Sequence, residues 1–253
     1  MRLLWLREVL AEAGLSVVPL PGWEGRGKDG MAAGGVIAHH TATRPGSDAA
    51  LDRVLINGRP DLPGPLCHLH LTRQGQYRVI AAGVANHAGS GGWKGLSGNR
   101  SVIGIEAAND GRGEAWPSVQ LLAYDQGAAA LLTRLGKDES WLCGHREWAP
   151  GRKIDPLGID LAAMRARVRA IMDPMTPTQA RIEVATAWHA ASGEWMTPLP
   201  NETRQQRLTR LAAEILTPGG RTAAQIATHA VRISPVPLEI SVPAWVLDPT
   251  VPG

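Results

Sequence analysis

Short apolar segments typical of β-strands alternate with segments of helical periodicity along the first 173 residues. The predicted strands are a short one in 15–23, then 35–42, a hairpin over 66–83 that turns at Arg73–Gln76, 100–110 and 141–145. The predicted helices are an N-terminal one that ends near Gly14, then 47–57, 118–136 and 157–172. Strands that alternate with helices predict an α/β domain that closes near residue 173.

The segment "DPMTPTQ" at 173–179 marks a predicted domain boundary, because its prolines and threonines directly follow a helix with basic residues near its end. We therefore expect two domains, 1–173 and 174–253. The second is predicted to be a small helical unit with a Pro-rich tail. Its tryptophans suit either stacking on the sugars of a cell wall or filling a small core: Trp188, Trp195 and Trp245.

Charge and targeting signals restrict the function only weakly. The net charge of +3 suits an anionic partner such as nucleic acid or an anionic cell wall, but no run of five basic residues occurs. Arg7 and Glu8 interrupt the N-terminal apolar run, so we expect a helix there and no signal peptide. No apolar stretch reaches the ~18 residues of a membrane span, so no membrane anchor is expected. The two cysteines form no CxxC pair and indicate synthesis in a reducing compartment.

Several side chains could bind a metal, and the strand pattern restricts how they combine. The candidates are His39, His40, Cys67, His68, His70, His87, Cys143, His145 and Asp155. Successive residues of a strand point to opposite faces, so His39 and His40 cannot both face one site. By the same rule His68 and His70 share a face and could form a metal pair of their own. A histidine at the end of strand 141–145 and a carboxylate in the next loop could also converge on one ion.

Glu106 is an acid within a largely apolar strand. Val102, Gly104 and Glu106 share one face of that predicted strand. A carboxylate placed there is unfavourable unless it is paired or functional. One such function is that of a base beside a metal-activated water.

Four motifs, in this order and spacing, resemble one enzyme family. They are "VIAHHTA" at 36–42, "NHAG" at 86–89, "NRSVIGIEAANDG" at 99–111 and "GHREWAPGRKIDPLGID" at 144–160. Together they resemble the zinc-dependent N-acetylmuramoyl-L-alanine amidases of the peptidoglycan-recognition-protein superfamily, as found in bacteriophage endolysins and bacterial cell-wall recycling enzymes. The resemblance covers roughly residues 15–172 and implies an α/β fold with a mixed central β-sheet flanked by helices.

The resemblance also implies the site. It makes His39, His145 and Asp155 the ligands of Zn²⁺, Glu106 the general base and Lys153 the residue that stabilises the oxyanion. The substrate would be peptidoglycan, cleaved at the amide between N-acetylmuramic acid and the L-alanine of the stem peptide. We expect two further residues to line the substrate groove, His87 and Trp93.

One departure from the family pattern concerns the strand of the hairpin. Cys67 stands where several relatives carry a tyrosine, which leaves Glu106 as the base. The family pattern does not explain His68 and His70, which are either ligands or residues of the core and the cleft wall.

Three alternatives stay open. The domain could bind peptidoglycan without cutting it, or it could be a metal-dependent nuclease, although no nucleic-acid-binding motif supports a nucleic-acid partner. The cellular role could be that of an endolysin, held in the host cytoplasm until it is released to the wall, or that of a recycling enzyme. We favour the endolysin. The sequence indicates no oligomeric state.

Overall fold

A six-stranded mixed sheet forms the centre of the computed structural model, which describes residues 1–173. The strands follow the order β1-β6-β5-β9-β2-β10. Only the β5–β6 hairpin pairs antiparallel within this sheet. The bounds are Val17–Pro19 (β1), Val36–His40 (β2), Leu69–Leu71 (β5), Tyr77–Val79 (β6), Ile103–Ala107 (β9) and Leu142–Gly144 (β10). The predicted mixed sheet and hairpin are confirmed, whereas the helices predicted after residue 173 lie outside the described residues.

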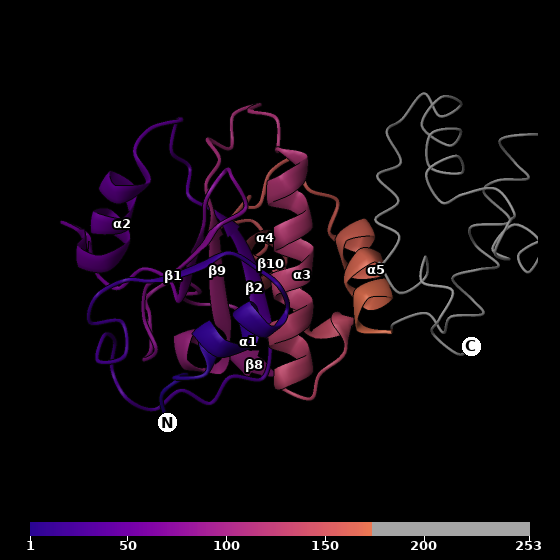
Figure 1. The fold of residues 1–253 in the computed structure, drawn as a ribbon, viewed down its shortest axis with the longest axis horizontal. Coiled ribbons are helices and arrows are strands. Elements are labelled where there is room, and N and C mark those ends of the chain that lie inside the picture. The colour runs from indigo at the N-terminus through magenta and orange to yellow at the C-terminus, as the bar shows by residue number, and fades with distance from the viewer. Residues whose placement is uncertain (174–253) are drawn as a thin grey trace, which may run out of the picture. The chain divides into compact units, whose positions relative to one another are not determined.

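Helices flank this sheet on both faces (Figure 1). They are α1 (Leu6–Glu12), α2 (Asp48–Asn57), α3 (Ser118–Arg134), α4 (His145–Trp148) and α5 (Leu161–Met172). Two short hairpins, β3–β4 (Gly58–Arg59, Leu62–Pro63) and β7–β8 (Gly92–Trp93, Leu96–Ser97), and two 3₁₀ turns (Asn99–Ser101, Glu139–Trp141) complete the described part. None of the helices described is long and apolar enough to cross a membrane.

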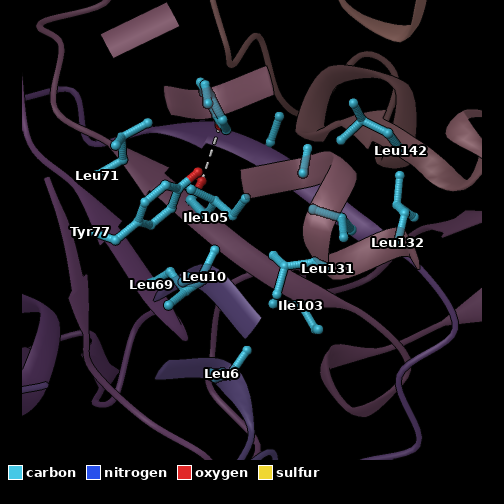
Figure 2. Close-up of a cluster of buried hydrophobic side chains, with 14 of the residues drawn as sticks. Leu6, Leu10, Leu69, Leu71, Tyr77, Ile103, Ile105, Leu131, Leu132 and Leu142 are labelled. Carbon is cyan, nitrogen blue, oxygen red and sulfur yellow. Dashed lines mark hydrogen bonds between the residues drawn. The ribbon is translucent and has the colours of Figure 1, made fainter. Parts of the chain in front are cut away.

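The main core lies between one face of the sheet and the helices α1, α3 and α5. Figure 2 shows Leu6 and Leu10 of α1 and Leu131 of α3 around Ile103 and Ile105 of β9. Burying a side chain of this size contributes about 1.5–3 kcal/mol. Val102 packs in a separate cluster on the other face, so the alternation predicted for this strand is confirmed.

Several predicted boundaries differ from the observed ones, and two of these differences lie next to the candidate site. The last helix begins at Leu161, not at residue 157, because Asp160 caps it by accepting from the N–H groups of Ala162 and Ala163 at 2.9 and 3.0 Å. Gly158, with φ 78°, turns the chain just before it. Strand β10 ends at Gly144, so His145 opens helix α4 and does not end the strand.

Candidate metal centre

Three ligand-type atoms meet at the ends of β2 and β10. The Nδ1 atoms of His39 and His145 lie 3.0 Å apart, and each lies 3.1 Å from Oδ2 of Asp155. Strand β2 carries His39, the first residue of α4 is His145, and Asp155 follows in the loop after α4. Within the described residues, these three side chains form the one group of His, Cys, Asp or Glu that is close enough together to hold a metal ion.

The spacing of these atoms fits a tetrahedral metal site. Metal–ligand bonds of about 2.0–2.1 Å place neighbouring ligands of a tetrahedral zinc ion roughly 3.3 Å apart. The observed separations of 3.0–3.1 Å are close to that value. A divalent cation would also balance the Asp155 carboxylate, which lies beside two ring nitrogens that both present lone pairs.

Hydrogen bonds made by the Nε2 atoms determine which nitrogen of each ring carries the proton and which keeps a lone pair. Nε2 of His145 lies 3.0 Å from the carbonyl oxygen of Ala88 and must carry the proton, because a carbonyl only accepts. Nε2 of His87 likewise donates to the carbonyl of Val102 at 3.3 Å, so Nδ1 of His87 accepts from Nε2 of His39 at 3.1 Å. Both metal-facing Nδ1 atoms are therefore unprotonated in the neutral rings, as ligation requires.

Burial keeps His39 and His87 neutral. It lowers the pKa of His39 to about 4, against the opposing hydrogen bond to Asp155. It also holds the pKa of His87 well below the usual value, with the neighbouring His68, His39 and His145 acting in the same direction. Both rings are thus neutral at neutral pH, and Nδ1 of His39 is available as a ligand atom.

His87, predicted to line the substrate groove, contacts a residue of the metal centre. Its ring is buried, and its Nδ1 lies 3.1 Å from Nε2 of His39. Gly104 makes room for it, because a Cβ atom there would lie 2.3 Å from Nδ1 of His87. The glycine between Val102 and Glu106 was a sequence signal for this close approach, but it does not name the residue that approaches.

Trp93, also predicted to line the groove, makes its contacts near the start of β10. Its Nε1 donates to the carbonyl of Ser140 at 2.9 Å, and its ring lies 5.7 Å below the guanidinium of Arg165. Ser140 precedes β10, whereas the metal centre follows the end of that strand. Trp93 is therefore a packing residue of the β7–β8 hairpin.

The segment that carries His145 and Asp155 is held by charged side chains. The N–H of Arg146 donates to the carbonyl of Asp155 at 2.8 Å, and its guanidinium donates to the carbonyls of Pro156 and Ile159. Arg165 of α5 makes a two-pronged ion pair with Glu147 of α4, with both contacts at 2.9 Å. The two ligands are thus attached to the core through α5.

His40 points away from His39, as the strand pattern predicted, and contributes to the same loop. Its Nδ1 accepts from the N–H of Leu157 at 3.0 Å. Gly111 lies against the ring, because a Cβ at this glycine would be 2.3 Å from Nε2 of His40. His40 therefore fixes the chain just after Asp155.

Glu106 is the nearest acid of the sheet to this centre, because it pairs in register with His39. Burial raises the pKa of Glu106 well above its usual value, and the Asp155 carboxylate adds to the rise. The positive charges of Lys153 and Arg59 oppose it. The arrangement provides a half-buried carboxyl, with one enclosed oxygen and high proton affinity, beside a half-buried lysine.

His68 and His70 are not a metal pair. Nδ1 of His68 accepts from the N–H of Gly104 at 3.0 Å, and its ring packs edge-on against His87 with centroids 5.1 Å apart. Nδ1 of His70 instead contacts Asp52 at 2.8 Å. Asp52 was not predicted as a site residue. It is an acid on the buried face of helix α2, and only that placement distinguishes it from the other acids of the chain.

Both cysteines are buried free thiols in different parts of the core. Burial raises the pKa of Cys67 well above its usual value, so the thiol is neutral and packs as a small apolar group.

Solved structures of amidases and endolysins are similar to this chain. A selenomethionine derivative of AmpD shares 24% identity over 60% of this chain and 93% of its own, with a TM-score of 0.47. The endolysin N-acetylmuramoyl-L-alanine amidase LysCS from Clostridium intestinale shares 14% identity over 60% of this chain and 95% of its own, with a TM-score of 0.48. A mutant endolysin from Bacillus subtilis shares 19% identity over 61% of this chain and 99% of its own, with a TM-score of 0.48. No curated protein sequence matches the chain.

A family model decides the assignment. The N-acetylmuramoyl-L-alanine amidase model matches residues 29–158, just over half of the 253 residues. The matched range contains all three atoms of the metal centre together with Glu106 and Lys153. The chain therefore belongs to the N-acetylmuramoyl-L-alanine amidase family.

Proposed function

We propose that this chain is a zinc-dependent amidase that cleaves peptidoglycan between N-acetylmuramic acid and the L-alanine of the stem peptide. The observation that carries the proposal is the triangle of His39, His145 and Asp155, with separations of 3.0–3.1 Å and both imidazole tautomers set by outer hydrogen bonds. Two neutral ligands and one anionic ligand are a common set for catalytic zinc.

These residues would hold the ion and leave one position open for water and the scissile carbonyl. When bound, zinc supplies Lewis-acid chemistry that polarises the carbonyl and makes the water more acidic. All other parts of the reaction fall to side chains of the chain itself.

Glu106 takes the proton of the attacking water and returns it to the leaving amine. Burial raises the pKa of this carboxyl, which strengthens it as a proton acceptor. Lys153, close enough for its charge to act on both Glu106 and His39, offsets the negative charge that develops on the carbonyl oxygen.

Mass spectrometry of the soluble products from purified peptidoglycan, with and without a chelator, tests this proposal. We expect free stem peptides that begin at L-alanine, loss of these products on chelation and their return on addition of zinc. Protein that pellets with the wall and releases no peptide would identify a binding module. Release of peptides that chelation does not affect would remove zinc from the reaction.

We further propose that the cellular role is that of an endolysin, held in the host cytoplasm until it reaches the wall. The proposal rests on the sequence beyond the family match, where residues 174–253 carry tryptophans suited to a wall-binding unit. An endolysin should cut the polymeric wall at least as fast as soluble muropeptides. A recycling enzyme should prefer the soluble fragments, so the ratio of the two rates separates the roles.

A further inference from the structure

A row of polar side chains crosses the sheet beside the metal centre. Glu106 of β9 pairs in register with His39 of β2 on one side and with His70 of β5 on the other, and His70 pairs with Arg78 of β6. Paired residues of neighbouring strands point to the same face, and the strands lie about 4.8 Å apart. Glu106 and His70 are therefore adjacent side chains, and His70 lies on the side away from the metal centre.

An ion pair holds His70 from the other side. Oδ1 of Asp52 lies 2.8 Å from Nδ1 of His70, and Oδ2 lies 2.6 Å from Nε of Arg78. The side chain of His70 is fully buried, and that of Asp52 is 6% exposed. A carboxylate only accepts hydrogen bonds, so the proton on Nδ1 of His70 points to Asp52. The opposite charges of Arg78 and Asp52 compensate each other within this contact.

Two buried polar atoms in this row have no partner. Among the described residues, Nε2 of His70 and Oε2 of Glu106 are both enclosed without a hydrogen bond. Asp52 occupies Nδ1 of His70 and also contacts Arg78 of β6, so Nε2, on the other side of the ring, is the atom left for a partner on the β9 side. An enclosed polar atom without a partner is unfavourable and rare in native proteins. A nitrogen and a carboxyl oxygen on adjacent side chains can satisfy one another.

We propose that His70 is a positioning residue for Glu106, which it holds by a hydrogen bond between Nε2 and Oε2, with Asp52 and Arg78 fixing the imidazole from behind. The inference rests on the proposed role of Glu106 as the base. It gives a role to His70, which is not among the residues that converge on the metal centre.

The hydrogen bond leaves one oxygen of Glu106 for the reaction. In a neutral His70 ring Nε2 accepts the proton of the Glu106 carboxyl, and in the imidazolium form Nε2 donates to the carboxylate. In both forms one proton lies between Nε2 and Oε2, and Glu106 can take the water's proton at Oε1 only when that shared proton sits on Nε2 and Glu106 is a carboxylate. Oε1 is then the atom that meets the attacking water, and its direction is set by His70.

Two substitutions at residue 70 separate positioning from packing. In His70→Asn the amide can still contact Asp52, but nothing replaces Nε2. In His70→Gln the longer amide reaches the Nε2 position. We expect His70→Asn to lower kcat on a soluble muropeptide on the order of tenfold, with KM and zinc content unchanged. His70→Gln should recover most of that loss.

A matched control weakens an acid–arginine pair elsewhere, in which the acid is buried and the arginine is half exposed. Asp125→Asn removes the partner of Arg167 between α3 and α5 and should lower thermal stability without changing kcat. If His70→Asn behaves like Asp125→Asn, with lower stability and wild-type kcat, His70 is a core residue and the inference is wrong.

A second readout needs neither activity nor a variant of His70. In protein labelled with ¹⁵N-histidine, Glu106→Gln should shift the Nε2 resonance of His70 by several ppm and leave its Nδ1–H signal in place. The ring of His40, outside the row, serves as the reference. An unchanged Nε2 resonance would overturn the inference. Wild-type protein that fails to cleave peptidoglycan would instead overturn the proposed function, while the resonance still decides whether the two side chains are joined.

Discussion

Nε2 of His39 lies 3.1 Å from Nδ1 of His87, and Nε2 of His87 lies 3.3 Å from the carbonyl oxygen of Val102. The carbonyl can only accept, so the whole chain of donors runs from His39 through His87 to the backbone of β9. His87 therefore sets the tautomer and the orientation of a proposed zinc ligand. This is the role that outer hydrogen-bond partners play in zinc proteins.

The first prediction concerns His87→Ala. Without the acceptor at Nδ1 the ring of His39 is free to rotate, and we expect zinc affinity to fall about 10–100-fold. KM at saturating zinc should stay near the wild-type value. Competition with a chromophoric chelator measures the affinity. Unchanged affinity together with a raised KM would return His87 to the substrate groove.

The second prediction uses Gly104, which gives the ring of His87 its space. In Gly104→Ala the new Cβ would lie 2.3 Å from Nδ1 and 2.6 Å from Cγ of His87, so the ring has to move. We expect the same loss of zinc affinity as in His87→Ala, and a loss of stability of about 1–3 kcal/mol from overpacking. Gly46→Ala is the control, because its Cβ would meet its nearest neighbour, the carbonyl oxygen of Arg44, at an ordinary 3.8 Å. Equal zinc affinity in the two variants would contradict this account.

The third prediction separates catalysis from metal binding. Glu106→Gln keeps the shape of the side chain but cannot accept the proton of water, so kcat should fall about 10²–10⁴-fold. Zinc content should not change, because Glu106 is not one of the three converging ligands. Metal analysis and single-turnover kinetics on the same preparation check both statements. An active Glu106→Gln protein would remove Glu106 from the base role.

The sequence predicted best those features that depend on residues close together in the chain. Alternation along one strand separates His39 from His40, and the structure confirms it: His39 faces Asp155, whereas His40 accepts from Leu157. The same alternation predicted that Gly104 and Glu106 share one face of β9. In the structure Ile103 and Ile105 occupy the opposite face. Such rules depend only on neighbours in the chain, so they apply before the fold is known.

What escaped prediction depends on strand register and on packing between elements. Asp52 and His70 meet because helix α2 lies over β5, and no spacing in the sequence signals that contact. The predicted groove role of His87 came from the family resemblance and that of Trp93 from its place on a Gly-rich loop, and neither signal indicates their contacts with His39 and Ser140. Only tertiary structure distinguishes these cases.

The fourth prediction concerns metal and stability. A ligand that binds only the folded state stabilises it by RT ln(1 + [L]/Kd), about 2.7 kcal/mol at 100 times Kd. For a unit of this size each kcal/mol raises Tm by roughly 2–4 °C, so zinc should raise Tm by about 5–10 °C. Asp155→Asn, which removes the anionic ligand, should lose most of this shift in a thermal melt. A shift that persists in Asp155→Asn would place the ion elsewhere.

The fifth prediction is a pH dependence that His68 introduces. Burial lowers the pKa of His68 to about 3, and the charge of His39 acts in the same direction. In the unfolded chain the pKa is about 6.5, so between these values the unfolded state binds a proton that the folded state does not. The free energy of unfolding therefore decreases as the pH falls below about 6.5.

From pH 7 to pH 5 this single group should remove about 2 kcal/mol of stability. His68→Gln offers an amide oxygen to the N–H of Gly104 but does not titrate, so its pH dependence should be smaller by that amount. Urea unfolding of chelator-treated protein at the two pH values measures the difference, because without metal no ligation is coupled to the protons. Between pH 7.5 and 8.5 the two proteins should respond alike, since histidine is neutral there in both states. If the two proteins respond identically between pH 7 and pH 5 as well, the folded state protonates His68 as readily as the unfolded chain does.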